Sequence, residues 1–92
     1  MKNFIERKGD LVRDLMAAMI PYRLVDPRDV ALTSMSSTVN AVMEQHHASG
    51  ALRASSFKWG IDNDRTTLSI EALWGEYTRP EDNDSFVLFV AA

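Results

Sequence analysis

The sequence contains no cysteine, and it has only four glycines and three prolines in 92 residues. Without cysteine the chain can build neither a disulfide framework nor a thiolate metal cluster, and its composition suits a reducing compartment. No apolar run approaches the roughly 20 residues that span a bilayer. The start, MKNFIERKGD, meets charged residues too early for the apolar region of a signal peptide. Neither a membrane segment nor a membrane partner is therefore expected.

Clusters of lysine and arginine are also missing. The net charge is −3 at pH 7, and the acidic excess falls within residues 51–92. Binding to a phosphate backbone needs grouped basic side chains, so nucleic acid is not an expected partner. The glycines at 9, 50, 60 and 75 form no phosphate-binding loop, and no G-x-S-x-G elbow occurs.

The overall composition is that of a globular protein. Hydrophobic residues make up 46% of the chain and charged residues 25%, so extensive disorder is not expected. The length fits one domain, residues 1–92. A domain this small buries a limited core, so that a partner can add substantially to its stability.

The first half of the sequence predicts two helices. Apolar residues recur at three- and four-residue spacing over residues 4–20, with Asn3 as the expected N-cap and Pro21 as the expected end. A second helix is expected to start in VDPRDV, residues 25–30, and to run to about His47. The methionines expected to fill the core are Met16, Met19, Met35 and Met43.

The second half changes to the period of two that is typical of strands. SSFKWGID and TTLSIEALW alternate apolar and polar residues around a turn at 62–64, and SFVLFVAA follows a polar connection at 78–84. Trp59 and Trp74 could stack on a ligand, but their positions favour the inward face of this hairpin. The predicted fold class is therefore α+β, with two helices packed on one face of a three-stranded antiparallel sheet, in the order ααβββ.

The stretch HHASGAL, residues 46–52, invites a catalytic or metal-binding interpretation. His46 and His47 are about 100° apart on a helix, so they do not converge on one ligand position as an i, i+4 pair would. Histidines in a last turn interact favourably with the helix dipole and the free carbonyl groups, and Gly50 can supply a left-handed residue after the end. We therefore expect a helix end here, and neither a metal nor a cofactor.

The acidic residues of the second half fall in the two predicted turns. DNDRTTLSIE superficially matches a calcium-binding loop, but it lacks the glycine at position 6 and the acidic residue at position 12. Solvated turns are the simpler interpretation. These carboxylates are Asp62, Asp64, Glu81, Asp82 and Asp84.

The predicted sheet has two outer edges, which natural proteins either protect or use to bind a partner strand. The last strand is apolar on both faces and carries no charge after Asp84, so an unpaired edge there would promote association. We expect subunit contacts along residues 57–61 and 86–90. The residues predicted to form this interface are Phe57, Trp59, Ile61, Phe86, Val87, Leu88, Phe89 and Val90.

Several short motifs, in this order, resemble the C-terminal domain of contractile phage tail sheath proteins and the related baseplate sheath initiators. A helix leads to YRLVDPRD (22–29), and a second helix ends in Gly-Ala-Leu (50–52). Two strands then lead to the proline-acidic step RPED (79–82), and the hydrophobic strand SFVLFV follows.

The resemblance implies a structural role without enzymatic activity. In that family, arms from neighbouring subunits add strands to this domain, and by analogy the two edges would be the docking lines here. The implied partners are tail sheath or baseplate subunits in a homo- or hetero-oligomer, located in the virion tail after assembly in the host cytoplasm. Because the inserted domains and N-terminal arm of sheath subunits are missing here, a sheath initiator or minimal baseplate component is the closer expectation.

Two other functions remain open from the sequence. The first is a small acidic protein, encoded by a phage or mobile element, that binds and inhibits or regulates a host protein through its acidic second half. The second is a small enzyme or metal-binding domain that uses His46 and His47. Neighbouring genes for tube, sheath and spike proteins would favour the tail component, whereas early or defence genes would favour the inhibitor.

Overall fold

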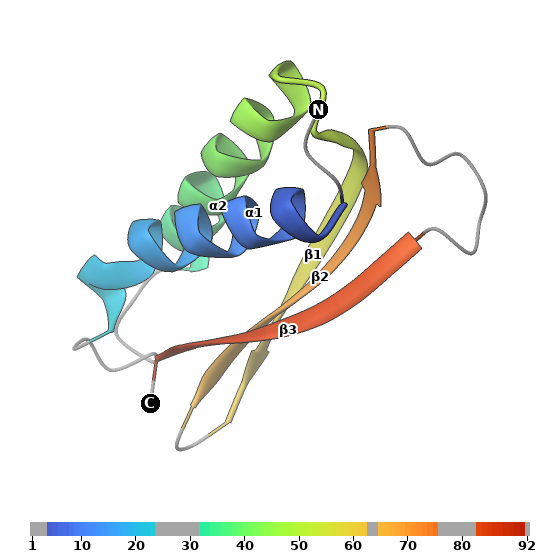
Figure 1. Cartoon of the computed structure of the whole chain (residues 1–92). Coiled ribbons are helices and arrows are strands. Elements are labelled where there is room, and N and C mark those ends of the chain that lie inside the picture. Colours follow the sequence, from blue (N-terminus) through green and yellow to red (C-terminus); the bar gives the residue numbers. More distant parts are fainter. Residues whose placement is uncertain (1–3, 24–31, 63–64, 76–82, 92) are drawn as a thin grey trace.

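A computed structural model describes residues 4–23, 32–62, 65–75 and 83–91 and confirms the predicted α+β class. Both helices lie on the same face of an antiparallel sheet, whose strand order is β1-β2-β3 (Figure 1). The elements are α1 (Phe4–Met19), the 3₁₀ turn η1 (Ile20–Tyr22), α2 (Leu32–Ala48), β1 (Leu52–Ile61), β2 (Thr66–Trp74) and β3 (Asn83–Ala91).

Helix α1 presents one apolar stripe to the sheet. Leu11, Leu15 and Met19 are four residues apart and completely buried, whereas Met16, also expected in the core, is only half-buried at the side of the helix. The α-helix ends at Met19, as Pro21 predicted, and continues as η1. The expected N-cap, Asn3, lies outside the described residues.

Helix α2 buries Met35, Val39, Val42 and Met43 and ends at Ala48, one residue beyond the prediction. Its expected start in residues 25–30 lies outside the described part of the chain. Gly50 has φ of 84°, and its backbone N–H donates to the carbonyl of His47. The predicted left-handed residue after the helix is therefore confirmed, and it is a conformation that glycine adopts without strain.

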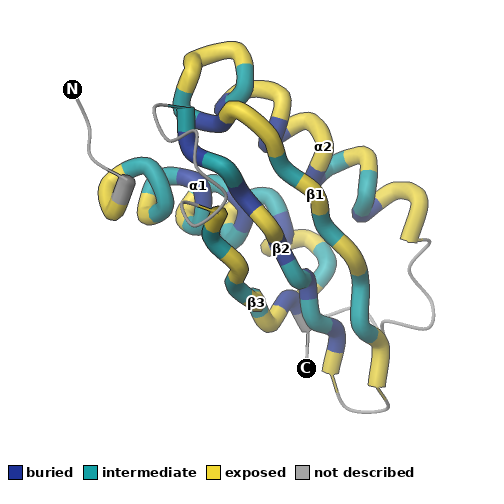
Figure 2. The backbone as a smooth tube through the Cα atoms, turned by 90° about the vertical axis from the view of Figure 1, so that its right-hand side faces the viewer, coloured by how far each residue is buried: buried dark blue, intermediate teal, exposed yellow. Residues whose placement is uncertain are grey.

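Strand β2 forms the centre of the sheet and supplies most of its buried side chains. Thr66, Leu68, Ile70, Ala72 and Trp74 are buried toward the helices, whereas the residues between them are more exposed (Figure 2). The predicted alternation is confirmed, because β2 is the strand with neighbours on both sides and with helices over one face.

Both outer strands are longer than predicted. Strand β1 begins at Leu52 rather than at Ser55, where the predicted stretch SSFKWGID starts, and a bulge between Leu52 and Ala54 interrupts its alternation. Strand β3 begins at Asn83, so Asp84 lies in a strand and not in the turn where it was expected. The Asp84 carboxylate lies 3.2 Å from Lys8 Nζ of α1, and this contact explains why an acidic residue is accommodated there.

The end of α2 and the end of β2 meet at two glycines. The backbone N–H of Gly75 donates to the carbonyl of Ala51 over 2.9 Å. A Cβ atom at Gly75 would collide with the carbonyl oxygen of Gly50. Only glycine therefore fits where the helical half turns into the sheet.

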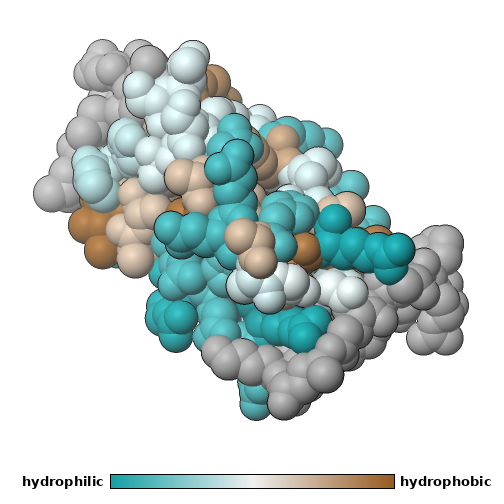
Figure 3. All heavy atoms as spheres, turned by 90° about the horizontal axis from the view of Figure 1, so that it is seen from above, coloured by the Kyte–Doolittle hydropathy of each residue, from teal (hydrophilic) through white to brown (hydrophobic). Residues whose placement is uncertain are grey.

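The helical side of the molecule has a mixed surface. Seen from above, hydrophilic side chains cover its middle, and hydrophobic ones gather toward the left-hand end (Figure 3). That is the end where η1 lies in Figure 1, and Ile20 of η1 is exposed. None of the described helices is long and apolar enough to cross a bilayer.

Candidate interaction surface

The outer edges of β1 and β3 are not paired with any strand that the structure describes. The backbone N–H of Asp62 donates to the carbonyl of Arg65 across the end of the β1–β2 hairpin. Bonded and non-bonded pairs alternate along an antiparallel ladder, so the backbone groups of Phe57, Trp59 and Ile61 point away from β2. The outer edge of β1 therefore presents backbone donors and acceptors at every second residue.

The same alternation determines which backbone groups of β3 face outward. Since the odd-numbered residues of β2 bond to β1, its even-numbered residues face β3, where Leu68 pairs with Leu88 and Ile70 with Phe86. The backbone groups of Ser85, Val87 and Phe89 consequently point away from β2. These three residues line the outer edge of β3.

The β1 edge carries several features that discourage strand pairing. The bulge at Arg53 and the exposed Lys58 both interrupt it, and such features protect natural edges. Helix α2 also holds this strand through two polar contacts. Trp59 Nε1 donates to Ser36 Oγ over 2.8 Å, and His47 Nε2 lies 2.9 Å from Ser55 Oγ.

The β3 edge also has a bulge, at Val90, but the stretch before this bulge carries fewer protective features. No charged side chain occurs from Ser85 to Val90, and Val87 and Phe89 are 54% and 60% exposed. These two side chains stand on the face of the sheet that the helices leave open. Unpaired backbone groups beside exposed apolar side chains are the usual requirements for binding another strand.

The structure places the predicted interface residues in both outer strands, but not all in the same way. The side chains of Phe57, Trp59, Phe86 and Leu88 are half-buried beneath the helices, and Phe57 packs edge-on against Trp59. Val90 is 1% exposed, so its side chain belongs to the core. Trp74 is completely buried, and both tryptophans face the helices, as predicted.

A shallow groove on the open face of the sheet was not predicted. It has a volume of about 260 Å³ and crosses all three strands. Its polar side chains come from Ser56, Lys58, Ser69, Glu71 and Ser85. Small serines beside larger neighbours create this hollow, and the sequence signal for it is the run of serines on one face of the predicted strands.

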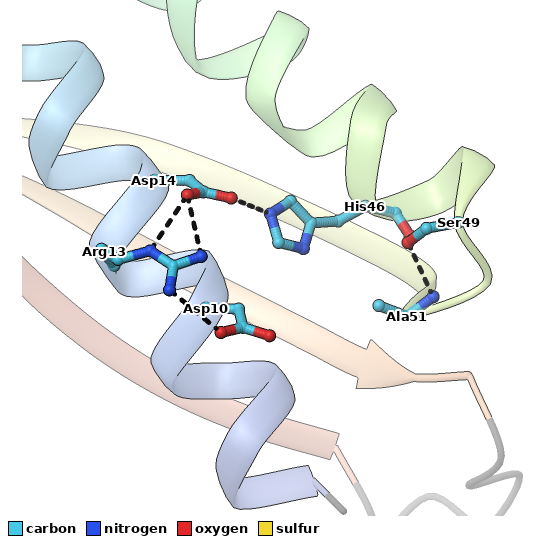
Figure 4. Close-up of polar contacts among 6 residues, drawn as sticks. All are labelled: Asp10, Arg13, Asp14, His46, Ser49 and Ala51. Carbon is cyan, nitrogen blue, oxygen red and sulfur yellow. Dashed lines mark hydrogen bonds and ion pairs between the residues drawn. The ribbon is translucent and has the colours of Figure 1, made fainter. Parts of the chain in front are cut away.

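The two histidines of α2 join it to other elements. His46 is buried, and its Nε2 lies 2.8 Å from Asp14 Oδ2 of α1, while Asp14 Oδ1 lies 3.4 Å from Arg13 (Figure 4). His47 contacts Ser55 of β1. Both histidines occupy the last turn as predicted, but their Nε2 atoms contact other elements instead of the free carbonyls of α2.

A polar cleft of about 300 Å³ lies beside this contact, lined by Arg7, Asp10, His46, Ser49 and Ala51. Ser49 Oγ donates to the carbonyl of His46, and the N–H of Ala51 donates to Ser49 Oγ (Figure 4). These bonds stabilise the end of α2. Within the described residues no three His, Cys, Asp or Glu side chains lie close enough together to hold a metal ion.

Comparisons with protein-family models, with curated proteins and with solved structures gave no match for this chain. The functional interpretation therefore depends on its own residues and their geometry.

Proposed function

We propose that this chain is a structural, non-enzymatic protein that joins neighbouring protein subunits by β-strand addition at the outer edge of β3. The observation that carries this function is the uncharged stretch of that edge before the bulge at Val90, where Ser85, Val87 and Phe89 turn their backbone groups outward. Backbone hydrogen bonds would supply affinity. The exposed Val87 and Phe89 side chains would favour an incoming strand with apolar residues at alternate positions.

The assembly that we propose is a contractile phage tail, in which the chain acts as a sheath or baseplate sheath-initiator component. The ordered motifs that resemble the sheath C-terminal domain support this context, and strand addition at β3 is the kind of contact that it requires. The proposed partners are sheath or baseplate subunits, and the proposed location is the tail of the virion.

A proline at position 87 provides a selective test of strand addition. The N–H of Val87 points away from β2, so Val87→Pro removes a donor from the outer edge and leaves the β2–β3 ladder intact. Ile61→Pro is the matched control, because it removes an outward N–H from the β1 edge.

The measurement is binding of the tagged full-length protein to purified sheath and baseplate subunits encoded beside it. We expect Val87→Pro to weaken binding at least about 5-fold, the effect of one lost hydrogen bond, and Ile61→Pro to leave it unchanged, while circular dichroism shows both variants folded. Deletion of residues 86–92 should likewise prevent assembly of contractile particles. Normal particles from a Val87→Pro mutant would contradict the proposed function.

A further inference from the structure

We propose that the β3 edge also pairs with the β3 edge of a second copy of this chain, in antiparallel orientation, with Val87 on the two-fold axis. This pairing rests on the proposed function, because it names a partner for the same edge. Strand β3 runs from Asn83 to Ala91, so Val87 is its central residue. An antiparallel pair with Val87 opposite Val87 is the two-fold register that pairs residues 85–89, the stretch before the bulge at Val90.

The backbone geometry fits this register. Opposite residues in it are Val87 with Val87, and Ser85 with Phe89 of the second copy. All three point their backbone groups outward, as shown above from the ladder with β2. Each of these pairs can therefore exchange two backbone hydrogen bonds, and the two sheets become one sheet of six strands.

The side chains of the edge also match. Directly opposite residues of an antiparallel pair lie on the same face, so Phe86 would meet Leu88 of the second copy beneath the helices. Both side chains are only half-buried in the single chain. On the open face, Val87 would contact its own copy beside the exposed Phe89. Apolar side chains would thus be covered on both faces.

Helix α1 extends this surface above the strand. Ile5, Lys8, Val12 and Met16 form one stripe at helical spacing, and Lys8 reaches β3, with its Nζ 4.9 Å from the centre of the Phe86 ring. This stripe therefore lies on the β3 side of α1. Asp14, roughly opposite on the helix, contacts α2 through His46.

The apolar members of the stripe are at most partly covered by the described residues. Ile5 is 69% exposed, and Val12 and Met16 are half-buried. Helix α1 and strand β3 run in the same direction (Figure 1). Lys8 contacts β3 at Asp84 and Phe86. Val12 lies four residues further along the helix, which is about 6 Å, and two strand residues also span about 6 Å. Val12 is therefore level with Val87.

The two-fold axis would therefore bring the α1 stripes of the two copies together directly above the paired strands. The mainly apolar stripe of α1 and the edge of β3 are centred on the same axis. A second copy would cover both surfaces, whereas an unrelated strand would cover only the edge. A lone added strand would cover the edge but would leave Ile5 exposed and Val12 and Met16 only half-buried.

Charges across the pair are complementary as well. Glu71 lies beside Ser85 on the open face, and the Arg65 guanidinium lies 5.5 Å from the centre of the Phe89 ring. In the pair, Ser85 of one copy would face Phe89 of the second copy. Glu71 of the first copy would then lie about 10 Å, or two strand spacings, from β3 of the second copy, where Arg65 of that copy contacts Phe89. Opposite charges on long side chains would approach each other twice, once on each side of the axis.

Disulfide trapping tests the register. Because the natural chain has no cysteine, only the introduced thiols can form a crosslink. Bonded antiparallel residues have Cα atoms about 5.5 Å apart, which suits a disulfide, so Val87→Cys should form a covalent dimer under mild oxidation. Phe89→Cys alone should not, because its two copies would be about 13 Å apart along the strands. Mixing Ser85→Cys with Phe89→Cys should restore the crosslink. Ile61→Cys, on the β1 edge, is the exposed control.

Sedimentation at several concentrations supplies the second measurement. The natural chain should dimerise, and Val87→Pro should weaken the dimer about 30-fold, since symmetry removes one hydrogen bond from each copy. A chain that stays monomeric, or Val87→Cys that crosslinks no better than Ile61→Cys, would overturn the pairing. If such a chain still binds tail subunits in a manner sensitive to Val87→Pro, the proposed function stands without it. A dimer with the expected crosslinks that binds no tail subunit would support the pairing and contradict the tail function.

Discussion

His46 Nε2 of α2 lies 2.8 Å from Asp14 Oδ2 of α1, and this polar contact joins the two helices beside their shared core. The bond requires only a proton on Nε2, which neutral imidazole can carry when Nδ1 is unprotonated. A histidine that suggested catalysis in the sequence is thus explained as a link between helices.

The coupling between these two residues can be measured. We expect His46→Ala and Asp14→Ala each to destabilise the fold, with a coupling energy of about 1–2 kcal/mol in a double-mutant cycle measured by urea unfolding. Arg13→Ala, at a residue that is mainly exposed, should change stability by no more than about 0.5 kcal/mol. A coupling energy of zero would show that the helices are held together by their apolar contacts alone.

The glycines predict a contrast among three alanine variants. Gly75→Ala should be the most harmful, because its Cβ meets the carbonyl of Gly50, and Gly50→Ala should cost about 1–2 kcal/mol for its left-handed backbone. Gly9→Ala should instead stabilise the protein by up to about 1 kcal/mol, since Gly9 lies inside α1 with open space around it. Thermal unfolding of the three variants gives the ranking. Equal effects would contradict the close approach at Gly75.

The bond from Trp59 to Ser36 should contribute a measurable part of the packing of α2 on β1. Trp59→Phe removes the donor and Ser36→Ala the acceptor, and each should lower the free energy of unfolding by about 0.5–1.5 kcal/mol. The double variant should cost less than the sum of the two. Strictly additive losses would mean that the bond contributes nothing to stability.

The contribution of Lys8 to stability, through its contacts between α1 and β3, should decrease as the salt concentration rises. Its Nζ lies 3.2 Å from Asp84 and over the Phe86 ring, so Lys8→Ala should destabilise the fold by up to about 1 kcal/mol. Because Lys8 is partly exposed, high salt should reduce the difference between the variant and the natural chain. A difference that is the same at low and high salt would assign the effect to packing of the lysine stem.

The sequence predicted the elements whose signals are local. The spacing of Leu11, Leu15 and Met19 and the alternation from Leu68 to Trp74 gave the helix, the central strand and the side of each that is buried. The early start of β1 was missed because the bulge at Arg53 disturbs the period of two.

Features that depend on distant partners were not predicted. An acidic residue such as Asp84 favours a turn in isolation, and only the approach of Lys8 from α1 makes it acceptable in a strand. The contacts of His46 with Asp14 and of His47 with Ser55 have no local signal either. Both free edges were predicted, but their unequal protection depends on the exposed Lys58 and on the contacts of α2 with β1, since each outer strand has a bulge.

Helix α1 and strand β3 lie against each other, although everything else in the domain is made between them. The helix therefore cannot complete its packing until β3 has been synthesised, and until then part of its apolar surface stays open to solvent. Once β3 has been made, it can pair either with β2 of its own chain or with the edge of another copy. The pairing of β3 with β2 of the same chain therefore competes directly with an exchange of this strand between identical copies.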